Sequence, residues 1–214
     1  YDNQDWSSSP GLIERQLFPD DEGLPYPDWE GSETAEFSFT ADLRSTPNLY
    51  APGLPLQVNR PVEAVAQILP EDQRDLVALL ADPNWVEGET YEVSTLVRLP
   101  NETELRESST DYPAWTERYL QLPEDFSSEV AGLARDIAFG QDTPYDIAFA
   151  ITRYLRINIE YSRTLPPVPS GADPMEWFLF DEMRGFCNYY ATAQVLMLRS
   201  LGIPARTAGG DAEG

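Results

Sequence analysis

A single cysteine is the residue with the clearest chemical potential in this sequence. Cys187 stands just ahead of a run, residues 189–201, that contains neither proline nor glycine. Four apolar residues recur near helical spacing in this run: Ala191, Val195, Leu198 and Leu201. This spacing predicts a helix with one buried stripe. Cys187 is therefore expected at the helix N-terminus, where the helix dipole favours a thiolate nucleophile over the neutral thiol.

Two glycines and a proline frame this segment. Gly185 stands shortly before the cysteine and predicts a tight turn that directs the sulfur to the start of the helix. Gly202 predicts the end of the helix, and Pro204 prevents it from continuing. The alternative for Cys187 is a core position, because free cysteines are among the most buried residue types.

The residues around Cys187 form a longer pattern that resembles a known family. The pattern reads Gly185-Phe186-Cys187, then Ala191, Ala193, Leu198-Arg199 and Leu201-Gly202-Ile203-Pro204-Ala205-Arg206. It resembles the nucleophile segment of the transglutaminase-like superfamily, which consists of papain-related thiol enzymes. An upstream set resembles the lead-in of bacterial members that are anchored in the membrane and carry this domain outside it: Tyr154-Leu155, Tyr161 and Phe178-Leu179-Phe180.

The resemblance implies a Cys-His-Asp thiol acyl transferase. Cys187 would attack a carboxamide, either a glutamine side chain or a peptide bond, and the resulting thioester would react with an amine or with water. The superfamily's histidine and aspartate come from strands after the nucleophile helix, whereas these 214 residues contain no histidine. The chain as written is therefore expected to be an inactive segment of a longer parent. The alternatives are a cysteine peptidase or amidase of the same fold and a non-catalytic binding or structural module.

Thiol acyl transfer also needs an acid for the leaving group and donors for the oxyanion. The backbone N–H of Cys187 is one candidate donor, and the sequence names no second one. Asp211 and Glu213 follow the motif in a glycine-rich tail, where a solvated loop is the favoured interpretation. We expect Arg199 and Arg206 to pair with carboxylates or support the loop after the helix rather than to anchor a substrate.

Charge and composition exclude several classes of protein. The formal net charge is -23, from 37 acidic and 14 basic residues, and the sequence contains no lysine. A nucleic acid would be repelled by this charge, so no nucleic-acid partner is predicted. One cysteine and no histidine exclude an internal disulfide and a thiolate or imidazole metal site. The carboxylates show no calcium-loop spacing, so no metal or other cofactor is predicted.

The sequence also bears on the membrane and on the compartment. It has no apolar run approaching the about 18 residues of a membrane-spanning helix, and no signal peptide begins at Tyr1. A membrane is thus expected only through helices of the parent outside this segment. Together with the resemblance, this implies an extracytoplasmic domain, periplasmic or on the cell surface, of a bacterial membrane protein that acts on a protein or peptide. No pattern specifies an oligomeric state.

The order of elements predicts an α+β fold in two domains. Residues 1–110 are expected to form a small β-rich domain, preceded by an irregular acidic arm over residues 1 to about 35. Alternation predicts strands over 36–43, closed by a turn at 46–48, and most clearly over 90–99. Residues 50–65 suit edge strands and loops. Residues 71–81 predict a short helix stopped before Pro83, and the polar residues 101–111 predict a linker or a long loop.

Residues 111–214 are expected to form the helical, cysteine-bearing half of a transglutaminase-like core. Ser127 or Ser128 predicts the start of one helix, and Thr143 with Pro144 the start of the next. A proline-rich stretch at 164–171 is expected to be extended. The aromatic residues that follow could line a cleft, but a core position is the favoured interpretation for Trp177, Phe178 and Phe180.

Overall fold

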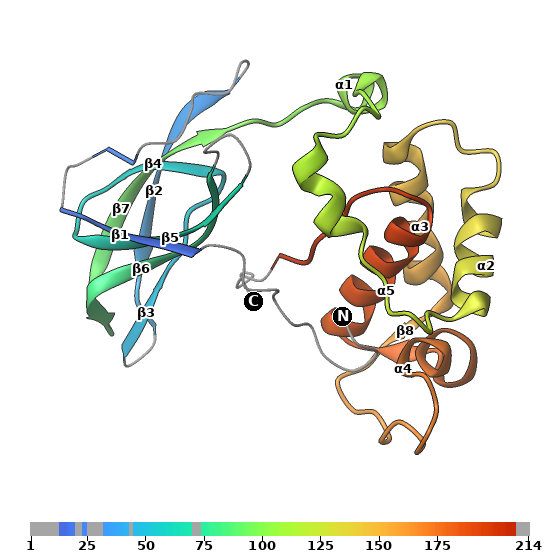
Figure 1. Cartoon of the computed structure of the whole chain (residues 1–214). Coiled ribbons are helices and arrows are strands. Elements are labelled where there is room, and N and C mark those ends of the chain that lie inside the picture. Colours follow the sequence, from blue (N-terminus) through green and yellow to red (C-terminus); the bar gives the residue numbers. More distant parts are fainter. Residues whose placement is uncertain (1–12, 20–22, 25–31, 43–44, 70–73, 209–214) are drawn as a thin grey trace. The chain divides into compact units, whose positions relative to one another are not determined.

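The computed structural model describes residues 13–19, 23–24, 32–42, 45–69 and 74–208 (Figure 1). The chain divides into a β unit that ends at Pro100 and a helical unit that begins at Asn101. A β-rich region followed by helices confirms the predicted α+β class. The boundary proposed between residues 110 and 111 falls inside the helical unit, and the predicted tail residues Asp211 and Glu213 lie outside the described residues.

The described part of the β unit consists of two antiparallel sheets. One has the order β1 (Ile13–Phe18), β5 (Val62–Ile68), β6 (Arg74–Val86) and β3 (Ser45–Leu49). The other has the order β2 (Glu33–Thr40), β7 (Thr90–Val97) and β4 (Leu54–Val58). Strands β2 and β7 confirm two predicted strands, while β1 lies inside the stretch predicted to be irregular. Side chains from both sheets share one core: Phe18, Leu49, Val58, Val62, Leu79, Trp85, Tyr91 and Val93.

The segment predicted as a helix over 71–81 is a strand in its described part. Strand β6 pairs with β5 on one side and with β3 on the other. Leu79 and Ala81, two residues apart, both point into the core, whereas Leu80 between them is only half-buried. This burial follows the period of a strand and not that of a helix. Two neighbouring strands satisfy the backbone of β6, and this pairing with residues distant in sequence outweighs local propensity.

The predicted turn at 46–48 is also a strand. Residues 46–48 lie in β3, at the edge of its sheet. The pairing register of β3 shifts between Thr46 and Asn48, and Pro47 stands at this shift. A proline lacks the N–H that a regular ladder needs, so an edge strand at an irregularity is where a sheet tolerates it.

The predicted linker at 101–111 contains a short helix, α1 (Glu102–Glu107). Asn101 caps it, because its side-chain oxygen accepts hydrogen bonds from the N–H groups of Thr103 and Glu104. In return, the Glu104 carboxylate accepts the N–H of Asn101 at 2.8 Å. This reciprocal capping box starts a helix that has no buried residue and no apolar periodicity to reveal it.

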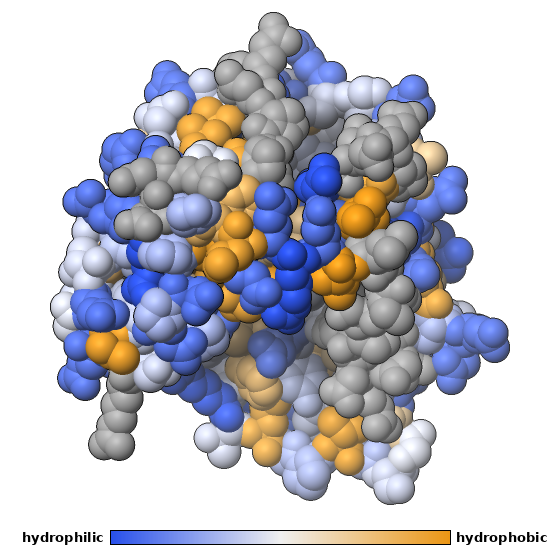
Figure 2. Space-filling view, turned by 60° about the vertical axis from the view of Figure 1, so that its left-hand side comes forward, coloured by the Kyte–Doolittle hydropathy of each residue, from blue (hydrophilic) through white to orange (hydrophobic). Residues whose placement is uncertain are grey.

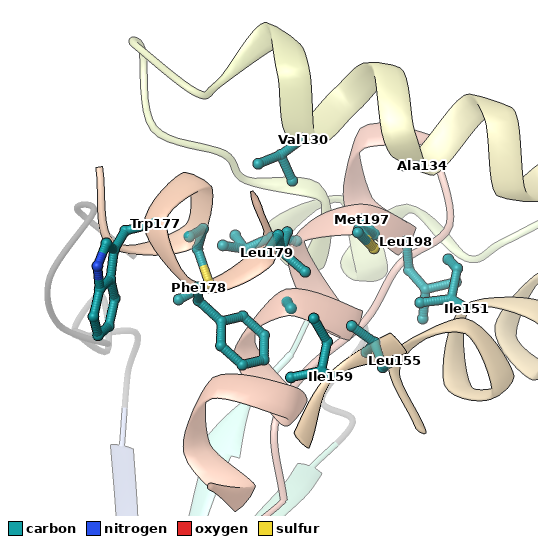
Figure 3. Close-up of a cluster of buried hydrophobic side chains, with 13 residues drawn as sticks. Val130, Ala134, Ile151, Leu155, Ile159, Trp177, Phe178, Leu179, Met197 and Leu198 are labelled. Atoms are coloured by element: carbon teal, nitrogen blue, oxygen red, sulfur yellow. The ribbon is translucent and has the colours of Figure 1, made fainter. Parts of the chain in front are cut away.

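The helical unit is built around α2 (Ser128–Ala138), α3 (Pro144–Asn158) and α5 (Cys187–Ser200). The predicted starts are confirmed: Ser127 caps α2, Thr143 caps α3, and Pro144 opens α3. Figure 3 shows the shared core, to which these helices contribute Val130, Ala134, Ile151, Leu155, Met197 and Leu198. Among the described residues, no helix is both long enough and apolar enough to cross a membrane.

One polar side chain lies deep in the core of the β unit. Tyr91 is 1% exposed, and its ring stacks on Phe39 and meets Trp85 edge-on. Its hydroxyl donates to the Tyr50 carbonyl at 2.8 Å and accepts the Tyr50 N–H at 2.6 Å. Burial raises the pKa of Tyr91 to about 12. The phenol therefore fixes the end of β3 against β7 and favours its neutral form.

Replacing Tyr91 with phenylalanine should lower the free energy of unfolding by about 1–3 kcal/mol, since the hydrogen bonds between Tyr91 and the partly buried backbone of Tyr50 are lost. Urea unfolding measures this. The control is Thr90→Val, which removes an exposed 2.8 Å hydrogen bond to Thr40 and should cost less than about 0.5 kcal/mol. Because its folded pKa is raised, Tyr91 stabilises the fold below pH about 10 and loses this effect as the pH rises through about 12. The free energy of unfolding of the phenylalanine variant should therefore fall less than that of the wild type as the pH rises above about 10. Equal decreases in the two proteins would contradict this role of Tyr91.

The net charge of -23 predicts a strong effect of salt on stability. The face seen in Figure 2 is largely hydrophilic, with smaller apolar patches among the hydrophilic residues. Carboxylates repel one another in the compact state, and raising ionic strength from 0.1 to 1 M shortens the Debye length from about 10 Å to about 3 Å. The urea midpoint should thus rise with KCl, and equally with NaCl if screening is the cause. A midpoint that is constant or falls over this range would show that charge repulsion does not limit the fold.

Candidate active site

The cysteine helix begins directly after a short strand pair. Strand β9 (Arg184–Gly185) pairs in parallel with β8 (Glu160–Tyr161), which follows α3 in the chain. The N–H of Glu160 donates to the Met183 carbonyl at 2.9 Å, and the N–H of Ser162 donates to the Gly185 carbonyl at 2.8 Å. These bonds hold the backbone on the approach to α5, so the end of α3 positions the start of the cysteine helix.

Cys187 is the first residue of α5, and it is exposed. This confirms the predicted place at a helix start and excludes the core position that was the alternative. The N-cap residue, Phe186, offers no side-chain hydrogen bond, and no other cap contact is present among the described residues of this first turn. The N–H groups of Cys187 and Asn188 have no acceptor within the helix, because the first turn lacks one. The sulfur therefore lies at a helix start that has no side-chain cap.

The sulfur has one hydrogen-bond partner among the described residues. Cys187 Sγ donates to Asn188 Oδ1 at 3.6 Å, a distance suited to the weak S–H donor. Asn188 is itself exposed. Asn188 is not among the residues that the sequence singles out; the signal that could have found it is its position directly after the cysteine, within reach along the first turn.

Gly185 serves close packing, and the tight turn predicted for it is wrong. Its backbone lies in strand β9 and outside the left-handed region. A Cβ at this position would lie 2.4 Å from Phe178 Cε2 and 3.1 Å from Tyr189 Cβ. Phe178 is wholly buried and cannot move aside at low cost. Only glycine therefore lets β9 pass this close to the core.

The reversal of the chain occurs at Met183 instead. The segment before it consists of α4 (Pro174–Glu176) and a π-helical turn, η3 (Trp177–Glu182). Met183 ends this turn with φ 51°, in the left-handed region, and so directs the chain into β9. Trp177 and Phe178 of η3 are buried, as predicted, whereas Phe180 is 39% exposed.

The buried surface of α5 is wider than the predicted stripe. Val195 and Leu198 are buried, but Ala191 is exposed. Leu196 and Met197 are buried completely, because α2, α3 and η2 (Ala114–Leu120) all contact this helix. The C-terminal half of α5 is thus enclosed, while its N-terminal turn carries the exposed thiol.

Arg199 anchors the loop after α5, which is one of the two roles predicted for it. It is buried, and its Nε donates to the Ala205 carbonyl at 2.8 Å while Nη1 donates to the Gln121 carbonyl at 2.9 Å. Burial lowers the pKa of its guanidinium. Gly202 closes the helix at φ 79°, as predicted. Arg206 lies over the ring of Tyr119, 5.7 Å from its centroid.

Within the described part of the chain, no group of three His, Cys, Asp or Glu side chains is arranged to hold a metal ion. The chemistry that the site itself displays is that of an exposed thiol beside a carboxamide and free helix N–H groups. Such an arrangement suits attack on a carbonyl, with donors near the oxygen that becomes negative.

Comparison with known sequences supports this class of site. Residues 131–214 match the sequence profile of the transglutaminase-like superfamily. A protein-glutamine gamma-glutamyltransferase of Pseudomonas aeruginosa is 40% identical over 107 residues, which are 50% of this chain and 16% of that protein. The uncharacterized protein YebA of Bacillus subtilis is 33% identical over 112 residues, 51% of this chain and 15% of YebA. The matched region is thus about a sixth of each relative's length.

Solved structures agree on the fold. The periplasmic domain of TgpA from Pseudomonas aeruginosa superposes with a TM-score of 0.57 at 24% identity, covering 100% of this chain and 67% of that one. Its ethylmercury-bound form gives a TM-score of 0.55, covering 95% and 64%. The fold is therefore that of the TgpA periplasmic domain. Residues 131–214 thus carry the sequence pattern of the transglutaminase-like superfamily.

The close approach at Gly185 can be tested by adding a methyl group. Gly185→Ala should lower the free energy of unfolding by about 1–3 kcal/mol, because Phe178 or β9 must shift. The control is Gly132→Ala in α2, where an added Cβ meets nothing within 4 Å. That change should raise the free energy of unfolding by about 0.5–1 kcal/mol through helix propensity. Urea unfolding measures both, and a neutral Gly185→Ala would show that the packing is adaptable.

Proposed function

We propose that Cys187 is the nucleophile of a thiol acyl transferase that acts on glutamine carboxamides of proteins or peptides. The observation that carries this proposal is the exposed cysteine at the first position of an uncapped helix, within the segment that matches the superfamily. The P. aeruginosa relative named as a glutamine gamma-glutamyltransferase supports the substrate class. The match to this relative covers 50% of the chain.

The proposed reaction has two stages. The Cys187 thiolate attacks the carboxamide carbon, and the C=O electron pair moves to oxygen. This oxyanion then collapses, the C–N bond breaks, and ammonia leaves after taking a proton from a general acid, which yields a thioester. In the second stage a primary amine attacks the thioester and gives one proton to a general base, the C–S bond breaks, and the thiolate leaves a new amide behind. Attack by water instead would give a net hydrolysis.

The general acid and base must come from outside these 214 residues. Histidine is the side chain best suited to exchange protons near neutral pH, and this chain contains none. We therefore propose that a longer protein containing this chain supplies it. The sequence likewise contains no lysine, so any isopeptide bond to a lysine must use a lysine outside these residues.

We further propose that the domain works outside the cytoplasm. The support is the fold shared with periplasmic domains. In that setting the substrates are proteins or peptides of the envelope or surface, and the membrane is reached through other parts of the parent protein.

The test is an assay of the longer protein with a glutamine-containing peptide, with and without a fluorescent primary amine. We expect ammonia release and incorporation of the amine, and Cys187→Ala should abolish both, because no other thiol exists in this chain to form the thioester. Ammonia without incorporation would indicate an amidase, and cleavage of the peptide backbone a peptidase. Full activity of the alanine variant would overturn the role of Cys187.

The matched control is Ser128→Ala, at the start of α2 and away from the thiol in sequence. It should retain the wild-type rate, since the cap of α2 is supplied by Ser127. If neither the wild type nor the control acts on glutamine or on peptide bonds, the non-catalytic module becomes the better account.

A further inference from the structure

We propose that the side-chain amide of Asn188 is a second donor to the oxyanion that forms at Cys187. This inference rests on the proposed function of Cys187 and names a further catalytic residue of the same site. The carboxamide of Asn188 lies 3.6 Å from the nucleophilic sulfur through Oδ1. Both residues belong to the exposed first turn of α5, so a substrate can reach them together.

The distance between the amide and the sulfur is compatible with donation to the oxyanion. In a tetrahedral intermediate, the negative oxygen is two bonds from Sγ, and a useful donor lies about 2.7–3.1 Å from that oxygen. A group 3.6 Å from Sγ can satisfy both separations, because the sulfur, the oxygen and the amide then form a triangle with the oxygen to one side of the line from sulfur to amide. The backbone N–H of Cys187 approaches from the helix start and supplies the first donor.

The orientation of the amide can change without moving the backbone. In the resting protein the thiol donates to Oδ1. Once the sulfur carries a negative charge, Oδ1 is repelled, and rotation about the last side-chain bond exchanges the oxygen and the NH₂ group. The Asn188 Nδ2–H groups then face the reacting centre and can donate to the oxyanion as the S–C bond forms.

The surroundings leave the Asn188 side chain free for this purpose. It caps no helix, because α5 has no side-chain cap bond. Among the described residues, Cys187 Sγ is its hydrogen-bond partner. A structural asparagine would be expected to bond the backbone, as Asn158 does when its Nδ2 donates to the Tyr154 carbonyl at 2.8 Å.

The experiment compares two reagents on the 214-residue chain. With p-nitrophenyl acetate, the thiolate attacks the carbonyl carbon, an oxyanion forms, and p-nitrophenolate leaves with its electron pair and without needing a proton from an acid. With iodoacetamide, the thiolate displaces iodide directly, and no oxyanion forms. The ratio of the two rate constants therefore cancels any change in the amount of thiolate and reports stabilisation of the oxyanion. The Cys187→Ala variant supplies the background rate.

Asn188→Leu keeps a similar shape and removes both N–H groups. It should lower the ratio about tenfold to a hundredfold. Because the site is exposed to water, we expect a decrease nearer to tenfold. Asn188→Gln keeps the donor and should stay within about threefold of wild type. The control Asn158→Leu removes an exposed asparagine elsewhere in the same unit and should leave the ratio unchanged.

The outcomes separate the two proposals. If Asn188→Leu leaves the ratio unchanged, while the folded chain still exceeds the ratio of the chain unfolded in urea, the role of Asn188 is overturned and that of Cys187 stands. If folded and unfolded chains give equal ratios, the site stabilises no oxyanion, and the proposed function fails with the inference. A drop with leucine, retention with glutamine and no effect at Asn158 support it.

Discussion

The contact between the β9 backbone and Phe178 is the constraint on which the site depends. Phe178 is wholly buried in the helical core. The strand passes so close to its ring that a Cβ at position 185 would collide with it, and glycine avoids this collision. Pairing with β8 then fixes the strand's other side. Because these contacts hold the backbone just before α5, the cysteine at the helix start has a fixed position although its side chain is exposed.

The two ends of α5 have opposite environments, and each suits its task. The C-terminal half is enclosed by neighbouring helices, and Arg199 ties the following loop to carbonyls of Gln121 and Ala205. Buried packing of this kind makes the helix a rigid support. The N-terminal turn has no side-chain cap and faces solvent, so its N–H groups remain available. A rigid helix with an open first turn suits the nucleophilic attack that we propose, because it holds the donors in place.

The proposed reaction needs one chemical group that these residues do not contain. The chain provides a thiol, an amide and helix N–H groups, but no histidine. Proton transfer to a leaving amine near neutral pH therefore needs a group from elsewhere. The relatives it matches are several times longer than the matched region, which leaves ample chain for such a group. The strongly acidic surface adds a second dependence, on ionic strength, since carboxylates far outnumber arginines.

The sequence by itself determined the elements whose signals are local. The caps at Ser127 and Thr143, the strand at 90–97 and the helix start at Cys187 follow from residue type and short-range spacing. Tertiary structure decided the rest. Strand β6 exists because two distant strands pair with it, Gly185 is needed because Phe178 lies against it, and Asn188 gains significance from its distance to the sulfur. These features depend on contacts between residues or side chains in space, which spacing along the chain does not reveal.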